Sequence, residues 1–278
     1  MGPTYRLWAG GERIFADFVV GADGVRSVVR RFFLGPLPKR RSLPAICRFY
    51  EKRPGDPIMI RVTPFPGYVW AFGRPDCLVV GVGAMEHGHS LGPELDRFMA
   101  EFFPGRKPLG PATGALLPRM YGAGAYRERR TGSGWALVGD AAGFCDTLTG
   151  EGILYAAWSA DLLAEAYLAG NPAAYDRAWR RAFGAHLALG ARMARVFSSH
   201  RNIDRFFTAI TACPSFRKVL MDFVWNLPSY PRLALQLIAT APRTLMEWRR
   251  FVKAGGRIDP SALGAFEAFA DRLTLHWD

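Results

Sequence analysis

The sequence predicts an α/β protein, α+β in part, with an antiparallel sheet between two parts of an open-sheet domain and a helical region at the C-terminus. Three observations predict this fold. Two apolar runs, residues 13–20 and 135–138, each lead into a glycine-flanked aspartate and then into a helical pattern. Between them, short apolar runs are separated by prolines and glycines, which is typical of hairpin-connected strands. After Gly152 the apolar spacing is helical almost to the end of the chain.

Composition limits the classes of protein to which the chain belongs. With 278 residues, half of them hydrophobic, the chain is long enough for a sizeable core. Its formal net charge of +12 favours an anionic partner such as nucleotide phosphates, a diphosphate substrate or acidic lipid headgroups. No nucleic-acid-binding motif accompanies the charge, so we expect no nucleic acid partner.

The cysteine and histidine positions predict no metal site. The four cysteines lie far apart, without a C-x-x-C pair or zinc-ligand spacing, and the five histidines are scattered. This usage fits a reducing cytoplasm. The chain has no secretion signal and no apolar run of membrane-spanning length, so any membrane contact is expected to be peripheral, on the inner face.

The N-terminal half contains the strand patterns. A hairpin around Gly10 and Gly11 joins residues 5–8 to 13–20, and a helix is predicted over residues 91–103, with Phe102 on its apolar side. Arginines and lysines of the connector at 30–31 and 39–41 are interpreted as a solvated loop. The predicted strands of the antiparallel sheet are residues 45–50, 58–63, 68–72 and 77–84, and residues 115–118 return the chain to the first domain.

The C-terminal half is predicted to be helical. One helix covers residues 153–168 and ends before Pro172, and a second extends from 173 to about 200. Prolines 214, 228, 231 and 242 are expected to divide the remainder into short helices. Its arginines suit either an ordinary helical cap with snorkelling side chains or a lipid-facing entrance.

The run from Gly139 to Gly152, GDAAGFCDTLTGEG, is the most specific motif of the chain. It resembles the second FAD fingerprint of the flavoprotein hydroxylase and geranylgeranyl reductase group, and most closely the reductases' D-P-x-T-G-E-G, with Thr147 in place of the usual proline. The resemblance implies that Asp140 accepts hydrogen bonds from ribityl hydroxyls and that the helix start after Gly150 faces the flavin pyrimidine. The implied cofactor contacts in this run are Gly139, Asp140, Gly150, Glu151 and Gly152.

A second motif, GADGVRSVVR at residues 21–30, is similar to the G-A-D-G-x-x-S-x-V-R segment of the same group. The resemblance implies that Asp23 lies near the ribityl and pyrophosphate region, with Gly24 allowing close approach and Arg26 helping to fix the loop. Asp23 could equally cap the helix that follows, and the two roles are compatible.

Three aromatic residues form a stripe in the antiparallel sheet. Tyr68, Trp70 and Phe72 share one face of a strand by its period of two, and such a stripe fits either a core or a ligand pocket. The run PGYVWAF resembles the reductases' P-x-G-Y-x-W-x-F-P, which implies that it lines an isoprenoid pocket. Tyr68 is the candidate proton donor, by residue type alone.

The G-x-G-x-x-G loop and the acidic residue that should follow it about twenty residues later are missing from the sequence. Either the sequence is a fragment or mis-started reading frame, or another polypeptide supplies the missing part, and we favour a fragment. Without the loop, FAD affinity is expected to be severely weakened.

Together these patterns predict a geranylgeranyl reductase-like, FAD-dependent oxidoreductase that reduces C=C bonds of an isoprenoid substrate with NAD(P)H or another electron donor. The alternatives are an FAD-dependent aromatic monooxygenase and a truncated, non-catalytic isoprenoid- or lipid-binding remnant. The expected domains are a partial FAD-binding domain (1–44), a substrate domain (45–117), the rest of the FAD-binding domain (118–170) and a helical region (171–278).

Overall fold

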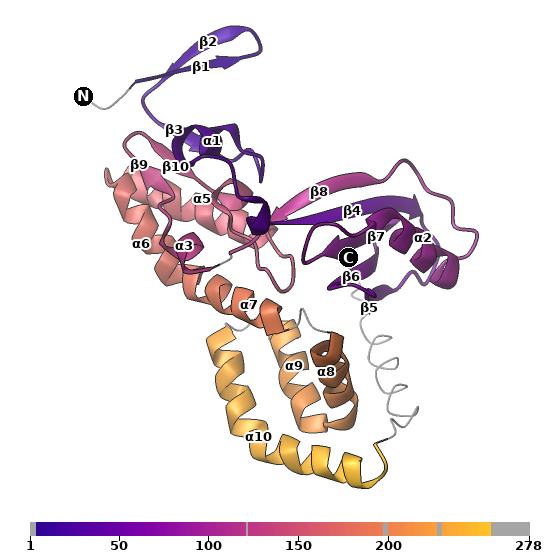
Figure 1. Ribbon diagram of the computed structural model, residues 1–278. Coiled ribbons are helices and arrows are strands. Elements are labelled where there is room, and N and C mark those ends of the chain that lie inside the picture. Colours follow the sequence, from indigo (N-terminus) through magenta and orange to yellow (C-terminus); the bar gives the residue numbers. More distant parts are fainter. Residues whose placement is uncertain (1–3, 121, 197–199, 227–229, 257–278) are drawn as a thin grey trace. The chain divides into compact units, whose positions relative to one another are not determined.

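The computed structural model describes residues 4–120, 122–196, 200–226 and 230–256 (Figure 1). The chain divides into two units, Met1–Arg195 and Val196–Asp278, and each is described by itself. The prediction of an α/β protein with an antiparallel sheet and helices towards the C-terminus is confirmed.

A small sheet brings together segments that are far apart in the sequence. Strands β3 (Val19–Gly21) and β10 (Trp135–Leu137) are parallel neighbours, and β9 (Thr131–Gly132) pairs antiparallel with β10. At the carboxyl ends, the Val138 amide donates to the Gly21 carbonyl at 3.0 Å. The two glycine–aspartate loops that follow β3 and β10 therefore begin at the same edge of this sheet, the edge where open α/β sheets bind ligands.

The N-terminal hairpin is separate from this sheet. Strands β1 (Tyr5–Ala9) and β2 (Glu12–Ala16) pair only with each other. The expected single strand over 13–20 is therefore wrong, because the chain changes direction at Asp17 and Phe18 to bring β3 against β10. The Phe18 ring packs edge-on against Tyr167, with their centroids 4.9 Å apart.

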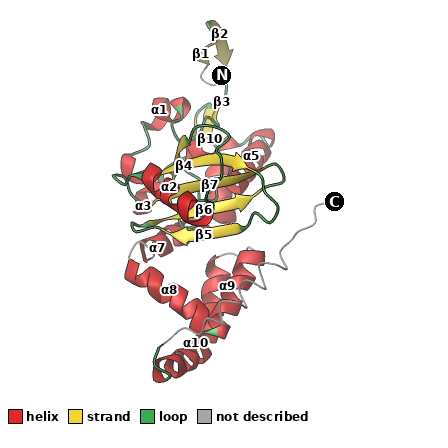
Figure 2. Ribbon diagram, turned by 90° about the vertical axis from the view of Figure 1, so that its right-hand side faces the viewer, coloured by secondary structure: helices red, strands yellow, loops and turns green. Residues whose placement is uncertain are grey.

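Five antiparallel strands form the larger sheet, in the order β5-β6-β7-β4-β8. Helix α2 (Leu91–Phe102) lies across one face of it (Figure 2). Val69 and Ala71 are buried on the covered face, together with Leu95 and Phe98 of the helix. Phe102 is 39% exposed instead of facing the sheet as expected, and Arg61 lies over its ring. The strands are β4 (Ser42–Glu51), β5 (Ile58–Val62), β6 (Gly67–Gly73), β7 (Cys77–Ala84) and β8 (Thr113–Pro118).

The aromatic stripe of β6 lies on the opposite face of this sheet. Since Val69 and Ala71 point towards α2, Tyr68, Trp70 and Phe72 point away from it. Their register partners on β5 (Ile60 opposite Trp70, for example) share this open face. The stripe is therefore not part of the core that α2 covers.

Helices cover the small sheet around a core centred on Trp179, which is fully buried with Tyr175 and Phe183. The predicted second helix is almost continuous from Pro172 to Val196, with a π-helical stretch in its middle. The helical elements of this unit are α1 (Val28–Leu34), η1 (Lys39–Arg41), α3 (Gly122–Arg127), α4 (Gly139–Ala142), α5 (Ile153–Leu168), η2 (Pro172–Ala174), α6 (Tyr175–Trp179), η3 (Arg180–Gly184) and α7 (Ala185–Val196).

The second unit contains α8 (His200–Ala212), α9 (Pro214–Asn226) and α10 (Tyr230–Lys253). Pro214 begins α9 as expected, and Pro228 lies outside the described residues. The prediction that Pro242 ends a helix is wrong, because Pro242 lies inside α10. A proline removes one hydrogen bond and crowds the preceding turn, which bends a helix without always ending it. Figure 1 shows α10 changing direction along its length.

Candidate functional site

The site is built where β10 ends. The short helix α4 follows the strand directly, and Gly139 at its start has φ of +54°. A Cβ on Gly139 would lie 3.0 Å from Cβ of Ala156 on α5, so the glycine allows the two helices to approach closely. The Gly139 amide donates to Ser159 Oγ at 3.0 Å, which fixes the loop on α5.

Asp140 is held in this loop without a partner. It is half-buried, and no hydrogen bond or ion pair to its carboxylate is formed within the described part of the chain. Burial alone raises its pKa. A Cβ on Gly152 would lie only 3.2 Å from Asp140 Oδ1. A half-buried carboxylate of this kind is unfavourable for folding and is available to hydroxyl donors of a ligand.

The N-terminus of α5 lies beside Asp140. Its N-cap is Gly152, which offers no side chain to the first-turn amides. Gly150 has φ of +76°, and a Cβ there would lie 3.1 Å from Tyr68 Oη. The amides at the start of this 16-residue helix can therefore bind an electron-rich group.

Asp146 anchors the loop between α4 and α5. Its Oδ1 accepts from the amides of Leu148 at 2.7 Å and Thr149 at 3.2 Å, and its Oδ2 lies 3.4 Å from His186 Nε2. Asp146 is 2% exposed. This role of Asp146 was not predicted from the sequence, although an aspartate in a loop commonly accepts from the backbone amide two residues later and so marks such a turn. The neighbouring Thr147 is buried, and its Oγ1 has no partner among the residues that the structure describes.

The aromatic stripe meets this loop at Tyr68. Its hydroxyl donates to the Thr149 carbonyl at 2.7 Å, and burial, with smaller contributions from Cys145 and Asp146, raises its pKa to about 12. Tyr68 and Trp70 line a cavity of about 30 Å³ together with Leu117, Thr147, Leu148 and Gly150, among others. Phe72 does not line this cavity and is 38% exposed.

Gly81 of β7 makes room for Trp70. A Cβ on Gly81 would lie 2.2 Å from the indole of Trp70, whereas one on Gly83 would lie 3.7 Å from it, at ordinary contact distance. The indole therefore lies flat against the backbone of β7. This close approach sets the position of Trp70 at the cavity wall.

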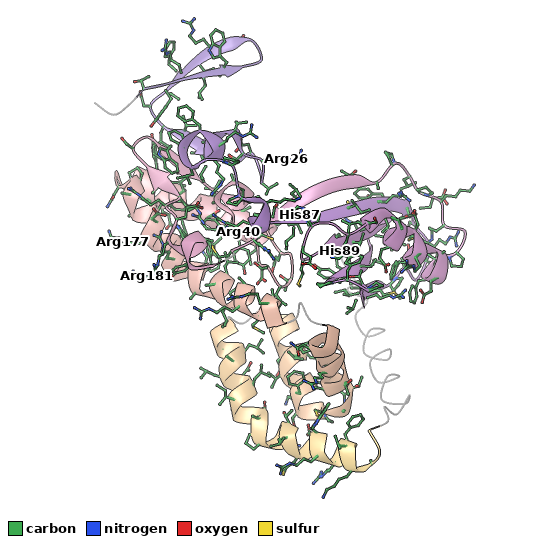
Figure 3. The ribbon with its side chains drawn as sticks, in the orientation of Figure 1. Arg26, Arg40, His87, His89, Arg177 and Arg181 are labelled. Carbon is green, nitrogen blue, oxygen red and sulfur yellow. The ribbon has the colours of Figure 1, made fainter. Side chains whose placement is uncertain are left out.

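The loop after β3 has a different geometry. Oδ2 of Asp23 accepts from the Val28 amide at 2.7 Å, and Ser27 Oγ accepts from the Arg30 amide at 2.8 Å, so both residues cap α1. Burial by itself raises the pKa of Asp23, but hydrogen bonds from Ser27 and Val28 lower it below the usual value. Gly24 has φ of +78°. Arg26 is exposed (Figure 3), whereas Arg30 is 1% exposed.

Three buried arginines converge on Glu128. Its carboxylate lies 2.8 Å from Arg30 Nη2, 3.1 Å from Arg41 Nη1 and 2.8 Å from Arg130 Nη1. We call these four residues the Glu128 cluster. Arg30 is 1% exposed and Arg41 is 5% exposed, so their interpretation as part of a solvated loop is wrong; Lys39 and Arg40 beside Arg41 are exposed. The cluster joins the connector, α1 and the segment before β9, and it contacts α4 where Arg30 Nη1 donates to the Ala141 carbonyl at 3.5 Å.

Comparisons with known proteins agree with the motifs. No family model matches the chain. It is 31% identical over 174 residues to the chloroplastic geranylgeranyl diphosphate reductase of Oryza sativa subsp. japonica, covering 59% of this chain and 36% of the relative. It is 30% identical over 193 residues to digeranylgeranylglycerophospholipid reductase of Methanothrix thermoacetophila, covering 63% of this chain and 49% of the relative.

Among solved structures, a geranylgeranyl bacteriochlorophyll reductase-like protein from Thermoplasma acidophilum superposes with a TM-score of 0.59 at 22% identity, covering 71% of this chain and 55% of that one. This likeness shows the fold. The resemblance to geranylgeranyl reductases is confirmed, and the chain spans between about a third and a half of the length of these curated relatives.

Proposed function

We propose that the chain carries the flavin-facing and substrate-facing parts of an FAD-dependent reductase that acts on prenyl C=C bonds. The observation that carries this proposal is the half-buried, partnerless carboxylate of Asp140 beside the uncapped start of α5. Folding leaves this group unsatisfied, which is expected of a residue that completes its hydrogen bonds with a ligand.

The residues around Asp140 fit a flavin. Asp140 would accept hydrogen bonds from ribityl hydroxyls, and the amides that follow Gly150, Glu151 and Gly152 would face the electron-rich pyrimidine. The loop with Asp23 and Gly24 begins at the same sheet edge and would approach the ribityl and pyrophosphate region. Since Asp23 already caps α1, its contribution would be to hold this loop in shape.

Exposed apolar side chains on the open face of the large sheet favour an apolar substrate. Ile58, Ile60 and Phe49 are 71%, 60% and 40% exposed on the same face as Tyr68 and Trp70. The cavity of about 30 Å³ has room for a few water molecules at most, so a prenyl chain would lie along this open face. The two curated relatives are named for geranylgeranyl and digeranylgeranyl compounds, which suggests a substrate of this class.

Reduced flavin would supply a hydride to the substrate's C=C bond. The protein's part is orientation and exclusion of water. Tyr68 stays protonated at neutral pH because its pKa is raised to about 12, and its proton is directed at the Thr149 carbonyl. A phenol this weakly acidic favours a positioning role over proton donation.

The test compares Asp140→Asn with wild type and with Asp161→Asn, which changes an exposed aspartate on α5. FAD is titrated into each purified protein and followed by flavin absorbance and fluorescence. Asp140→Asn should weaken FAD binding at least tenfold, whereas Asp161→Asn should leave it unchanged.

The apo proteins give a second readout. Burial raises the pKa of Asp140, so its charged form destabilises the folded state at neutral pH. Asp140→Asn should therefore unfold at the same temperature as wild type or higher. A lower unfolding temperature with unchanged FAD affinity would mean that Asp140 is a structural residue and the proposal is wrong.

Turnover separates the reaction classes. With NAD(P)H or dithionite as reductant, a prenyl substrate should gain hydrogen without consumption of oxygen. Oxygen consumption stimulated by a phenolic compound would instead indicate an aromatic monooxygenase.

A further inference from the structure

Helix α10 packs on the other helices of its unit through one face. Leu233 on this face is 2% exposed. Further along, the Glu247 carboxylate accepts from the Ser215 amide at 3.0 Å and from Ser215 Oγ at 2.7 Å, and Cys213 Sγ lies 3.7 Å from the Thr244 carbonyl. Leu233, Thr244 and Glu247 are separated by eleven and three residues, about three turns and one turn, so they define one inner face of α10.

The opposite face of α10 carries exposed apolar side chains. Leu235 is 68% exposed and Ile238 is 70% exposed before Pro242, and three more apolar residues follow it. Spacings of three, seven and eight residues keep them on one side of a helix. We call this the α10 apolar stripe; it comprises Leu235, Ile238, Leu245 (50%), Met246 (53%) and Val252 (55%).

Basic residues lie beside the stripe, and Arg249, three turns after Ile238, lies within it. Five of them are exposed on the same helix, and one of these, Arg243, lies 3.6 Å from the Glu247 carboxylate that Ser215 engages on the inner face. Exposed apolar side chains beside a basic border are the pattern of a helix that lies in a membrane interface. The basic residues are Arg232, Arg243, Arg249, Arg250 and Lys253.

We propose that the outer face of α10 docks on an anionic membrane surface. The apolar stripe would enter the boundary between headgroups and acyl chains, and the arginines would contact phosphate and acidic headgroups. No helix in the described part of the chain is long and apolar enough to cross a bilayer.

Charge argues against a second copy of the chain as the occupant. A two-fold symmetric interface through the stripe would bring two copies of the same basic helix face together. The repulsion between these cations would oppose association, whereas an anionic bilayer neutralises them. The proposal is independent of flavin binding, because α10 carries no residue of the candidate site.

The test is co-sedimentation of the full chain with large vesicles of phosphatidylcholine alone or of phosphatidylcholine and phosphatidylglycerol at about 3:1. Binding should require phosphatidylglycerol and weaken with salt. Arg249→Gln with Arg250→Gln should lower the partition coefficient by roughly thirty-fold, from about fivefold for each basic residue near the surface. The matched control is Arg177→Gln with Arg181→Gln, which removes the same charge from two exposed arginines on α6 and η3 (Figure 3) and should change binding less than threefold.

Apolar variants test the stripe itself. Leu235→Ser with Ile238→Ser should lower binding at least tenfold. The matched control is Trp8→Ser with Phe15→Ser, because these side chains are 69% and 61% exposed on the N-terminal hairpin beside Arg6 and Arg13. Circular dichroism and unfolding temperature establish that each variant is folded.

Three results would overturn the proposal. The wild-type chain could fail to sediment with anionic vesicles. The hairpin variant could lose binding while the α10 variants keep it. Wild type could be a dimer in solution that Leu235→Ser with Ile238→Ser converts to monomer, which would make the stripe a self-interface.

Discussion

Glu128→Gln is the substitution with the largest expected effect on stability. Glu128 is the carboxylate that three buried guanidinium groups share, all within 3.1 Å, and its own side chain is 22% exposed. The amide would keep the shape but remove the negative charge. Arg30, Arg41 and Arg130 would then face one another without a counter-charge in the cluster, with four of their nitrogens already lacking a partner.

Removing one partner of a buried ion pair lowers the free energy of unfolding by about 3–5 kcal/mol, and we expect a loss of this size for Glu128→Gln. For a chain of this size each kcal/mol lowers the unfolding temperature by about 2–4 °C, so a decrease of roughly 6–20 °C is expected. The measurement is thermal and urea unfolding followed by circular dichroism. Glu101→Gln is the control, because its partly exposed pair with Arg61 should contribute at most about 1 kcal/mol.

The pH dependence gives a second check on the Glu128 cluster. Burial by itself raises the pKa of Glu128, but Arg130, Arg30 and Arg41 together lower it below the usual value. A lowered folded-state pKa means that the stabilisation is complete above the unfolded value of about 4.3 and is lost as pH falls through the folded value. The difference between wild type and Glu128→Gln should thus be full at pH 7 and shrink below about pH 4. A loss under 1 kcal/mol at pH 7 would refute this account of the cluster.

Two further predictions concern the aromatic stripe. Tyr68→Phe removes the hydrogen bond to the Thr149 carbonyl and should lower the free energy of unfolding by about 1 kcal/mol, measured by urea unfolding. In the FAD titration this variant should bind FAD severalfold more weakly. An unchanged FAD affinity would mean that Tyr68 does not position the loop for the cofactor. Gly81→Ala places a Cβ 2.2 Å from the Trp70 indole; it should displace the indole and lower the free energy of unfolding by about 1–3 kcal/mol. Gly92→Ala is the control, because a Cβ at this position on α2 meets no atom within 4 Å. Equal unfolding temperatures for the two variants would contradict the packing described for Trp70.

Local patterns in the sequence predict much of this fold. The strands of the large sheet, helix α2 and helix α5 follow from period-two or helical spacing bounded by glycine and proline. Asp140 could be singled out because small residues surround it at the end of a strand. The lack of a partner for the Asp140 carboxylate could not be predicted, because it depends on which side chains α5 and the loop bring near Asp140.

Contacts between segments far apart in the sequence determine the features that local patterns did not predict. Arg41 lies in a basic run that suits a solvated loop, and its burial depends on Glu128, far along the chain. Trp70 and its neighbours fit a core until the position of α2 is known, since period two cannot tell one sheet face from the other. Pro242 marks a helix end by local rules, yet packing of α10 on α9 continues past it.

The large sheet also bears on how the chain can fold. β3 and β10 must meet although more than a hundred residues separate them, and closing so long a loop is entropically unfavourable. The segment from Ser42 to Pro118, which forms the large sheet, is inserted between β3 and β10. Its two ends lie together, because Ser42 pairs with Pro118 and the Arg119 amide donates to the Arg41 carbonyl at 3.0 Å. Once the five strands have formed, the remaining loop consists of two short connectors. The entropic cost of closing a loop grows with the logarithm of its length, so this shortening lowers the free energy needed to pair β3 with β10 by about 1 kcal/mol. Formation of the large sheet therefore brings the two halves of the candidate site close to each other.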